Sequence, residues 1–151
     1  MQYWLMKSEP SVYSIDDLKR DKKTYWDGVR NFQARNFMRD SMKMGDLVLF
    51  YHSNAEPSGV AGIAKVGREG YPDFTAWDKK DIHYDPKSTK EKPLWSMVDL
   101  EFVEKFSRFV SLEEMKKNFD LKRMMVTKAG RLSVQPVERK HFEIVRKIGN
   151  K

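Results

Sequence analysis

The sequence predicts one α+β domain, built as a small, mostly antiparallel β-barrel with short peripheral helices. Three observations favour it: the strand-like runs mostly follow one another, the helical stretches between them are short, and the two kinds do not alternate regularly as in a doubly wound parallel sheet. The chain has 151 residues and 40% apolar content, enough for one core and too little for two ordinary domains. We therefore expect residues 1–151 to form a single domain.

The first elements are a strand and a short helix. Residues 3–6 have strand character, and Pro10 ends that segment because proline cannot continue a central ladder. Ser14 with Asp17 resembles a capping box, in which each residue bonds the backbone of the other. This predicts a helix over residues 15–20.

A turn and a second short helix are expected next. Gly28 breaks the chain, and Asn31 is a good N-cap for the helix that follows. Arg35 and Arg39 share one face of that helix. The opposite face carries Ala34, Phe37, Met38 and Ser41.

Two strands are predicted in the middle of the chain, over residues 47–51 and 59–68. Gly59, Gly62 and Gly67 in the second strand lack the spacing of a dinucleotide fingerprint, so bulges or close backbone approach explain them better. Residues 71–93 are polar and lysine-rich, which indicates a long surface excursion with one helical turn near residues 75–77.

The C-terminal part predicts a strand over residues 95–106 and a helix capped by Ser111 with Glu114. That helix is expected to carry Leu112, Met115 and Phe119. A short helix near residues 124–125, a strand over 132–134 that stops near Pro136, and a final helix with Phe142, Val145 and Ile148 complete the order. Closure of the barrel would leave few open edges and a mouth where loops converge, which is a usual place for a pocket.

The composition narrows the class of protein. A formal charge of +7 and a pI near 9.5 favour an anionic partner, because clustered lysine and arginine release counterions from phosphates. The absence of cysteine excludes disulfides, zinc ribbons and cysteine nucleophiles. No apolar stretch approaches the roughly 20 residues that span a bilayer, and no signal peptide is visible. We expect a cytoplasmic, soluble protein without membrane contact.

Motifs of catalysis are missing. His52, His83 and His141 lie far apart, and none belongs to a zinc-binding helical pair. The chain lacks a Walker loop and a G-x-S-x-G elbow. We therefore predict no catalytic residue, no metal, no cofactor and no enzyme activity.

Residues 26–36 bring an indole, guanidinium groups and carboxamides together beside a glycine turn. An aromatic face can stack on a base, an amide can recognise a base edge, and arginine can hold a phosphate. The alternative is that Trp26 anchors the core and the arginines only solvate a helix.

Several segments in order resemble the EVE domain family, the family of the thymocyte nuclear proteins and their small bacterial relatives. They are YWLMKSEP (3–10), WDGVRNFQARN (26–36), GD (45–46), FYHSN (50–54), YPD (71–73), YDPKS (84–88) and RLSVQPV (131–137). The resemblance covers residues 1–148 and implies a PUA-like fold, a small β-barrel with helices at its rim, related to the YTH domains that read methylated adenine in RNA. Phe32, where the family commonly has tyrosine, and Ser58 depart from the pattern.

The resemblance also implies binding of nucleic acid that contains modified bases, with modified cytosine in DNA as the leading candidate and RNA as the other. Our hypothesis is a reader that holds one flipped base in a pocket at the barrel mouth, stacked on Trp26 with Phe32 or Tyr51. Arg35 and Arg39, together with Arg30, would hold phosphates. The residues expected at the base are Lys7, Ser8, Glu9, Trp26, Val29, Arg30, Asn31, Phe32, Gln33, Tyr51, His52, Ser53 and Asn54.

Two alternatives stay open at this point. One is an RNA-binding accessory module of the PUA type. The other is a small enzyme acting on modified bases, with His52 or Asp73 as acid or base. Because the eukaryotic members carry a basic extension ahead of the domain and this sequence starts at the domain, a bacterial-type protein is the expectation. Nothing in the sequence resembles a coiled coil or a swapped arm, so we expect a monomer.

Overall fold

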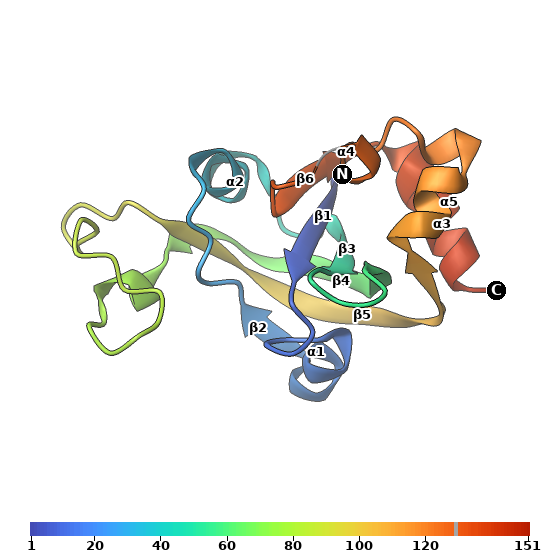
Figure 1. The fold of residues 1–151 in the computed structure, drawn as a ribbon. Helices are drawn as coiled ribbons and strands as arrows, with labels where there is room; N and C mark the ends of the chain where they lie inside the picture. The colour runs from blue at the N-terminus through green and yellow to red at the C-terminus, as the bar shows by residue number, and fades with distance from the viewer. Residues whose placement is uncertain (129) are drawn as a thin grey trace.

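The computed structural model describes residues 1–128 and 130–151. Its centre is one six-stranded sheet with the strand order β2-β5-β4-β3-β1-β6. Figure 1 shows β4 and β5 running the length of the molecule, with α3 and α5 at one end and the loop that joins the two strands at the other. The strands are β1 (Tyr3–Ser8), β2 (Lys23–Tyr25), β3 (Leu47–His52), β4 (Gly59–Pro72), β5 (Ser96–Ser111) and β6 (Val134–Val137).

The α+β class with a mostly antiparallel sheet is confirmed, but the predicted closure of the barrel is wrong. The pair β1 and β3 is parallel, and the other four neighbouring pairs are antiparallel. Within residues 1–128 and 130–151, β2 pairs only with β5 and β6 only with β1, so the sheet stays open. These edge strands have three and four residues, and such short edges expose few unpaired backbone groups.

Short helices surround the sheet, as predicted. They are α1 (Ile15–Asp21), α2 (Phe32–Asn36), α3 (Leu112–Lys117), α4 (Met125–Lys128) and α5 (Arg139–Gly149), with a π-helical turn at Phe37–Ser41 and 3₁₀ turns at Phe74–Trp77 and Phe119–Leu121. The expected place of Phe119 on the apolar face of α3 is wrong. Asn118 adopts an extended conformation that ends α3, and Phe119 is 76% exposed.

Side-chain caps fix the helix starts. The Ser14 and Asp17 capping box is complete, with both reciprocal bonds formed. The Asn31 side chain accepts a bond from the Ala34 amide at 3.0 Å, which starts α2. The Ser111 hydroxyl accepts from the Glu114 amide, but the Glu114 carboxylate pairs with Arg108, so only half of the second predicted box forms.

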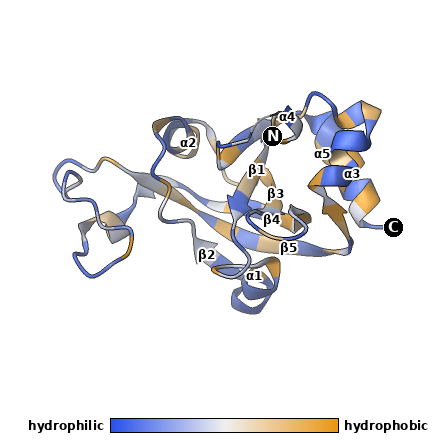
Figure 2. Cartoon of the chain, viewed as in Figure 1, coloured by the Kyte–Doolittle hydropathy of each residue, from blue (hydrophilic) through white to orange (hydrophobic). Residues whose placement is uncertain are grey.

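Two apolar clusters cover the two faces of the sheet, because residues alternate along each strand. In β1, Trp4 and Met6 belong to one cluster and Leu5 to the other. The first cluster includes buried residues of α1 and α2, and the second includes those of α3 and α5. In Figure 2 the strands mix apolar and hydrophilic segments, whereas the long loop between β4 and β5 is mostly hydrophilic.

Three strand details differ from the sequence-based prediction or refine it. The predicted bulges along the glycine-bearing strand are confirmed, because the register against β5 shifts between Val60 and Gly62 and again between Val66 and Arg68. Strand β6 begins at Val134 rather than residue 132 and continues through Pro136, which an edge strand tolerates because a missing N–H there breaks no inner ladder. Strand β2 was not predicted, since its three residues form no apolar run.

No helix in residues 1–128 or 130–151 combines the length and the apolar character needed to cross a membrane.

Candidate functional site

A cavity of about 630 Å³ lies at the carboxyl end of β1. Lys7, Ser8 and Glu9 form one wall, and the segment that follows β2 forms another. The loop between β4 and β5 contributes Ile82 and His83. The remaining lining residues are Val12, Tyr13, Ser133 and residues 24–30. A strand end, a turn and a distant loop therefore converge on one hollow.

A second hollow of about 500 Å³ adjoins the first. It shares Lys7, Glu9 and Ser133 with the first cavity. It adds the predicted residues Tyr51, Ser53 and Asn54. The two hollows therefore share a wall at the end of β1.

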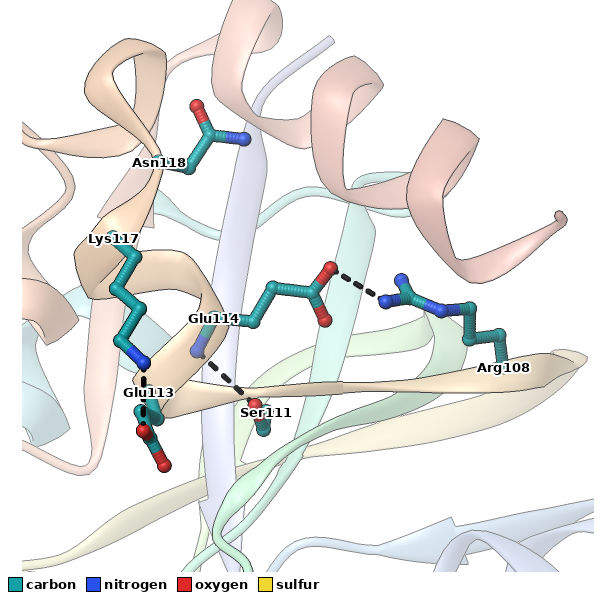
Figure 3. A pocket seen from close by; sticks show the side chains of 6 residues that line it. All are labelled: Arg108, Ser111, Glu113, Glu114, Lys117 and Asn118. Carbon is teal, nitrogen blue, oxygen red and sulfur yellow. Dashed lines mark hydrogen bonds and ion pairs between the residues drawn. The ribbon is translucent and has the colours of Figure 1, made fainter.

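A third hollow beside α3 has a similar volume of about 500 Å³ but a different chemistry. Its charged side chains are paired with each other, Arg108 with Glu114 at 2.8 Å and Lys117 with Glu113 at 2.9 Å (Figure 3). No aromatic ring lines it within the described chain. This hollow therefore lacks a group on which a base could stack.

The structure brings part of the predicted site together. Six predicted residues line the first cavity, and three more, Tyr51, Ser53 and Asn54, line only the adjoining one. Six others lie outside both: Asn31, Phe32, Gln33, His52, Arg35 and Arg39.

Trp26 belongs to the core and to the cavity at once. Its indole is 8% exposed and meets the Phe50 ring edge to face, with 5.5 Å between centroids. Its backbone amide donates to the Val98 carbonyl at 2.8 Å, which ties the turn to β5. The same side chain lines the cavity. Both interpretations of Trp26 from the sequence, core anchor and cavity wall, therefore describe its position.

The polar groups at the end of β1 are held by neighbours. The Lys7 ammonium donates to the Gly130 carbonyl and lies 5.5 Å from the Tyr51 ring centre. Burial lowers the pKa of Lys7 from its ordinary value. The Asn54 amide donates to the Glu9 carboxylate at 2.5 Å. These contacts fix the side chains before any ligand arrives.

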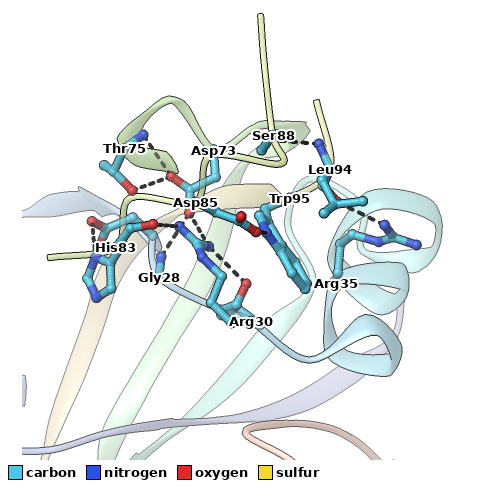
Figure 4. A network of polar contacts seen from close by, with 12 residues as sticks. Gly28, Arg30, Arg35, Asp73, Thr75, His83, Asp85, Ser88, Leu94 and Trp95 are labelled. Atoms are coloured by element: carbon cyan, nitrogen blue, oxygen red, sulfur yellow. Dashed lines mark hydrogen bonds and ion pairs between the residues drawn. The ribbon is translucent and has the colours of Figure 1, made fainter. Parts of the chain in front are cut away.

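Asp73 is the centre of a buried network that joins the turn to the distant loop (Figure 4). One carboxylate oxygen accepts from the Gly28 amide at 2.8 Å and from Arg30 at 2.9 Å, and the other accepts from the Thr75 amide and hydroxyl. Burial alone would raise the pKa of Asp73, but the bonds from Thr75, Gly28 and Arg30 outweigh it and hold this pKa below its ordinary value. Arg30 also donates to the His83 carbonyl at 2.7 Å.

His83 stands between two carboxylates at the cavity wall. Its Nδ1 lies 3.3 Å from Asp27 and 3.4 Å from Asp81. Burial raises the pKa of Asp27, although the neighbouring imidazole opposes the shift. Among the described residues, these three side chains form a group whose ligand atoms, all within 4.8 Å of each other, could hold a metal ion. Sequence analysis missed the group because its members come from two segments more than 50 residues apart.

Gly28 lets the turn pass closely under that histidine. Its φ is +83°, and an added Cβ would lie 2.5 to 2.7 Å from three atoms of the His83 ring. Gly45 has a φ of +85° but open space around it. Both glycines therefore have the positive φ that disfavours other residues, but only at Gly28 would a side chain also collide with a neighbour.

We predict that Gly28→Ala destabilises the protein more than Gly45→Ala. Both variants carry the left-handed backbone penalty of about 1–2 kcal/mol, but only the first also displaces His83. Chemical denaturation of both variants measures the difference. Equal losses of stability would contradict the close approach.

The predicted residues outside the cavities form a separate stack. The Phe32 ring is 54% exposed and lies 4.8 Å from the Trp95 ring at an interplanar angle of 21°. Arg35 lies 4.8 Å from the centre of the Phe32 ring and donates to the Leu94 carbonyl at 2.8 Å. Arg39 forms an exposed ion pair with Asp40. Phe32 therefore covers Trp95 on the outer surface.

His52 has a structural position. Its Nε2 accepts a bond from the Ile15 amide at 3.1 Å, next to the capped start of α1. The imidazole packs against Phe50 and Phe109. Burial lowers the pKa of His52, which favours the neutral form that accepts this bond.

Comparison with known proteins adds independent findings. The family model for the EVE domain matches residues 2–148. Thymocyte nuclear protein 1 of Gallus gallus is 45% identical over 95% of this chain and 66% of its own length, so the chain spans about two thirds of that relative.

Solved structures show the same similarity. The human THYN1 protein in complex with 5-methylcytosine-containing DNA has a TM-score of 0.93 and 43% identity, covering 100% of this chain and 99% of that one. A protein from Pseudomonas syringae has a TM-score of 0.93 and 44% identity, covering 97% and 99%. The expectation of a bacterial-type protein therefore has no support, because the human and the bacterial structures match this chain equally well.

A more distant structure shares the fold alone. The YTH domain of a Zygosaccharomyces rouxii protein, in complex with N6-methyladenosine RNA, has a TM-score of 0.59 and 12% identity, covering 99% of this chain and 87% of that one. The PUA-like class predicted from the sequence agrees with this likeness.

Proposed function

Because the chain belongs to the EVE domain family, we propose that it is a reader of modified bases in nucleic acid. The reader takes one flipped base, a 5-modified cytosine in DNA, into the cavity at the end of β1. The observation that supports this most is the convergence of an aromatic wall at Trp26 with fixed polar groups at Ser8 and Glu9. The related human protein was crystallised with 5-methylcytosine-containing DNA.

The cavity suits a base in size and chemistry. Its volume of about 630 Å³ falls within the roughly 300–1,000 Å³ of ordinary ligand sites. Stacking on an aromatic ring contributes about 1–3 kcal/mol per base, which offsets part of the few kcal/mol needed to extrude that base from a duplex. Trp26 and Tyr25 are the aromatic side chains available beside β2.

Recognition of cytosine and of its mark requires different groups. A carboxylate accepts a hydrogen bond from the cytosine N4 amino group, and Glu9 and Asp27 are carboxylates on the lining. A methyl group needs an apolar contact, which Val29 and the Trp26 indole provide. One such methyl contributes about 1–3 kcal/mol, or roughly 10–200-fold in affinity. We therefore propose a modest preference.

We propose binding without turnover. The two residues considered as acid or base are both engaged, His52 by the Ile15 amide and Asp73 by four hydrogen bonds. Neither lines the cavity. Mass spectrometry of a modified strand recovered after incubation should show unchanged mass, and a shifted mass would establish an enzyme.

Arg39 provides a test of the phosphate contacts. Its pair with Asp40 is exposed and contributes little, so a phosphate can replace that carboxylate. We predict that Arg39→Ala weakens binding to modified and plain duplexes alike and lowers the salt slope by about 0.9. Arg139→Ala is the control, since it removes a comparable exposed pair with Glu143 on α5. Binding titrations at several salt concentrations measure both slopes, and equal slopes for the two variants would exclude Arg39 as a phosphate ligand.

Nuclear magnetic resonance tests the location of the base. A short single strand with a central 5-methylcytosine should shift the Trp26 indole N–H and the Ser8 and Val29 amides more than the matched cytosine strand does. Ser111, in the hollow beside α3, should stay unchanged with both. Shifts that are confined to Ser111 and its neighbours would move the site away from β1. Matched RNA strands test the alternative of an RNA-binding module.

A further inference from the structure

Ile82 combines extreme exposure with a place on the cavity wall. It is 92% exposed, more than any other large apolar side chain among those described, and it lines the cavity next to His83. An aliphatic side chain that stays surrounded by water contributes no hydrophobic stabilisation to the fold, because that stabilisation comes from burial. Its place on the cavity wall puts this exposed side chain where a bound ligand can contact it.

The backbone on both sides of Ile82 is held in place. The Asp81 carboxylate accepts from the His83 amide at 2.8 Å, and the Asp81 carbonyl accepts from the Tyr84 amide at 3.0 Å. Arg30, which also lines the cavity, donates to the His83 carbonyl at 2.7 Å. Figure 4 shows His83 beside Gly28 and Arg30 within this network. The tip is thus prepared in one conformation, with the isoleucine projecting beyond the anchored residues.

The surroundings of the tip point to nucleic acid as the partner. Lys79, Lys80 and Lys87 lie in the same loop and are exposed. None of these lysines forms an ion pair within the described residues 1–128 and 130–151. The loop also carries Asp78, Asp81 and Asp85, whose carboxylates accept hydrogen bonds from backbone amides of the loop itself. A bare apolar side chain in a loop with unpaired ammonium groups fits the base stack of DNA between two charged backbones. An apolar protein partner would leave those charges without counterparts.

Flipping a base leaves a gap in the duplex, and apolar side chains such as Ile, Leu or Phe commonly enter stacks between bases. On the basis of the proposed function, we propose that Ile82 is a wedge that enters the duplex at the position vacated by the flipped base. The base moves into the cavity while the side chain on its rim takes its place in the stack. Val12, which is 73% exposed, lines the same cavity from the turn after β1.

The experiment compares duplex and single-stranded DNA, because only the duplex needs a wedge. Wild type, Ile82→Ala and Ile82→Leu are titrated with a duplex carrying one central 5-methylcytosine and with that strand alone. Met44→Ala is the control, since Met44 is 65% exposed and lines neither cavity. 2-Aminopurine next to the target base reports unstacking by its fluorescence.

We expect Ile82→Ala to weaken duplex binding by roughly tenfold or more and to lose the 2-aminopurine signal, with single-strand affinity unchanged. Ile82→Leu should retain both, and Met44→Ala should match wild type. Full duplex affinity and signal in Ile82→Ala would overturn the wedge while leaving the reader intact. A wild-type protein that prefers no modified strand, single or duplex, would overturn the reader function and the wedge with it.

Discussion

Asp73→Asn should lower the free energy of unfolding by about 3–5 kcal/mol, the cost of breaking a buried ion pair by removing one partner. All four contacts of the carboxylate are donors: the Gly28 amide, the Arg30 guanidinium, and the amide and hydroxyl of Thr75. An asparagine side chain has the same shape but turns one acceptor into a donor, so it opposes groups that also donate. The anchor between the turn and the loop of His83 would be lost together with stability.

Asp40→Asn is the matched control, because its ion pair with Arg39 is exposed on both sides and its loss should change the free energy of unfolding little. Urea unfolding of the two variants gives both values. A loss below about 1 kcal/mol in Asp73→Asn would mean that the buried network does not hold the turn and the loop together.

The pH dependence of stability gives a second view of Asp73. Its folded pKa lies below the ordinary value, so its stabilising contribution is present above the unfolded pKa of about 3.9 and is lost as pH falls through the folded pKa. The difference in stability between wild type and Asp73→Asn should therefore narrow as the pH drops below about 4.

Trp26→Ala should have the largest effect on binding. If the proposed site is correct, removing the aromatic wall forfeits about 1–3 kcal/mol of stacking and the apolar contact proposed for the methyl group. The preference for 5-methylcytosine over cytosine should therefore disappear. The same change leaves a gap against Phe50 and should cost about 3–5 kcal/mol of stability. Binding is therefore measured well below the melting temperature of the variant.

Two further variants separate the role of the ring from damage to the fold. Trp26→Phe keeps an aromatic face and most of the volume, so it should retain part of the preference. Phe32→Ala removes a ring that lies outside both cavities and covers Trp95, so it should leave the preference unchanged. A preference that survives Trp26→Ala but is lost in Phe32→Ala would move the base to the outer stack.

Local features were predictable from the sequence. The capping box of Ser14 and Asp17 and the cap at Asn31 depend on neighbours within three residues, and both form. The openness of the sheet was not predictable, since it depends on how far β2 and β6 extend at opposite edges. The prediction that Phe119 packs on the apolar face of α3 was wrong for a related reason. The helix ends before Asn118, so the helical spacing of apolar residues does not extend to Phe119.

In the candidate site, too, the sequence predicts some of the residues and only the tertiary structure reveals the others. The segments carrying Glu9 and Trp26 were recognised as motifs, and the fold brings them to one cavity. The side chains that complete the wall, Ile82 and His83, come from a loop more than 50 residues further along the chain. Their own segment contains no signal of that contact, and the neighbouring segment at residues 84–88 contributed only to the family resemblance. Only tertiary structure reveals which turn this loop meets.

The most direct test of the reader function is the ratio of dissociation constants for matched DNA strands with cytosine or 5-methylcytosine, measured by fluorescence anisotropy at one salt concentration. Strands with 5-hydroxymethylcytosine or N6-methyladenine and the corresponding RNA identify the mark and the sugar. We predict a preference for 5-modified cytosine in DNA of roughly 10–200-fold. Equal affinity for every strand, falling steeply with salt as phosphate contacts alone require, would contradict the reader function.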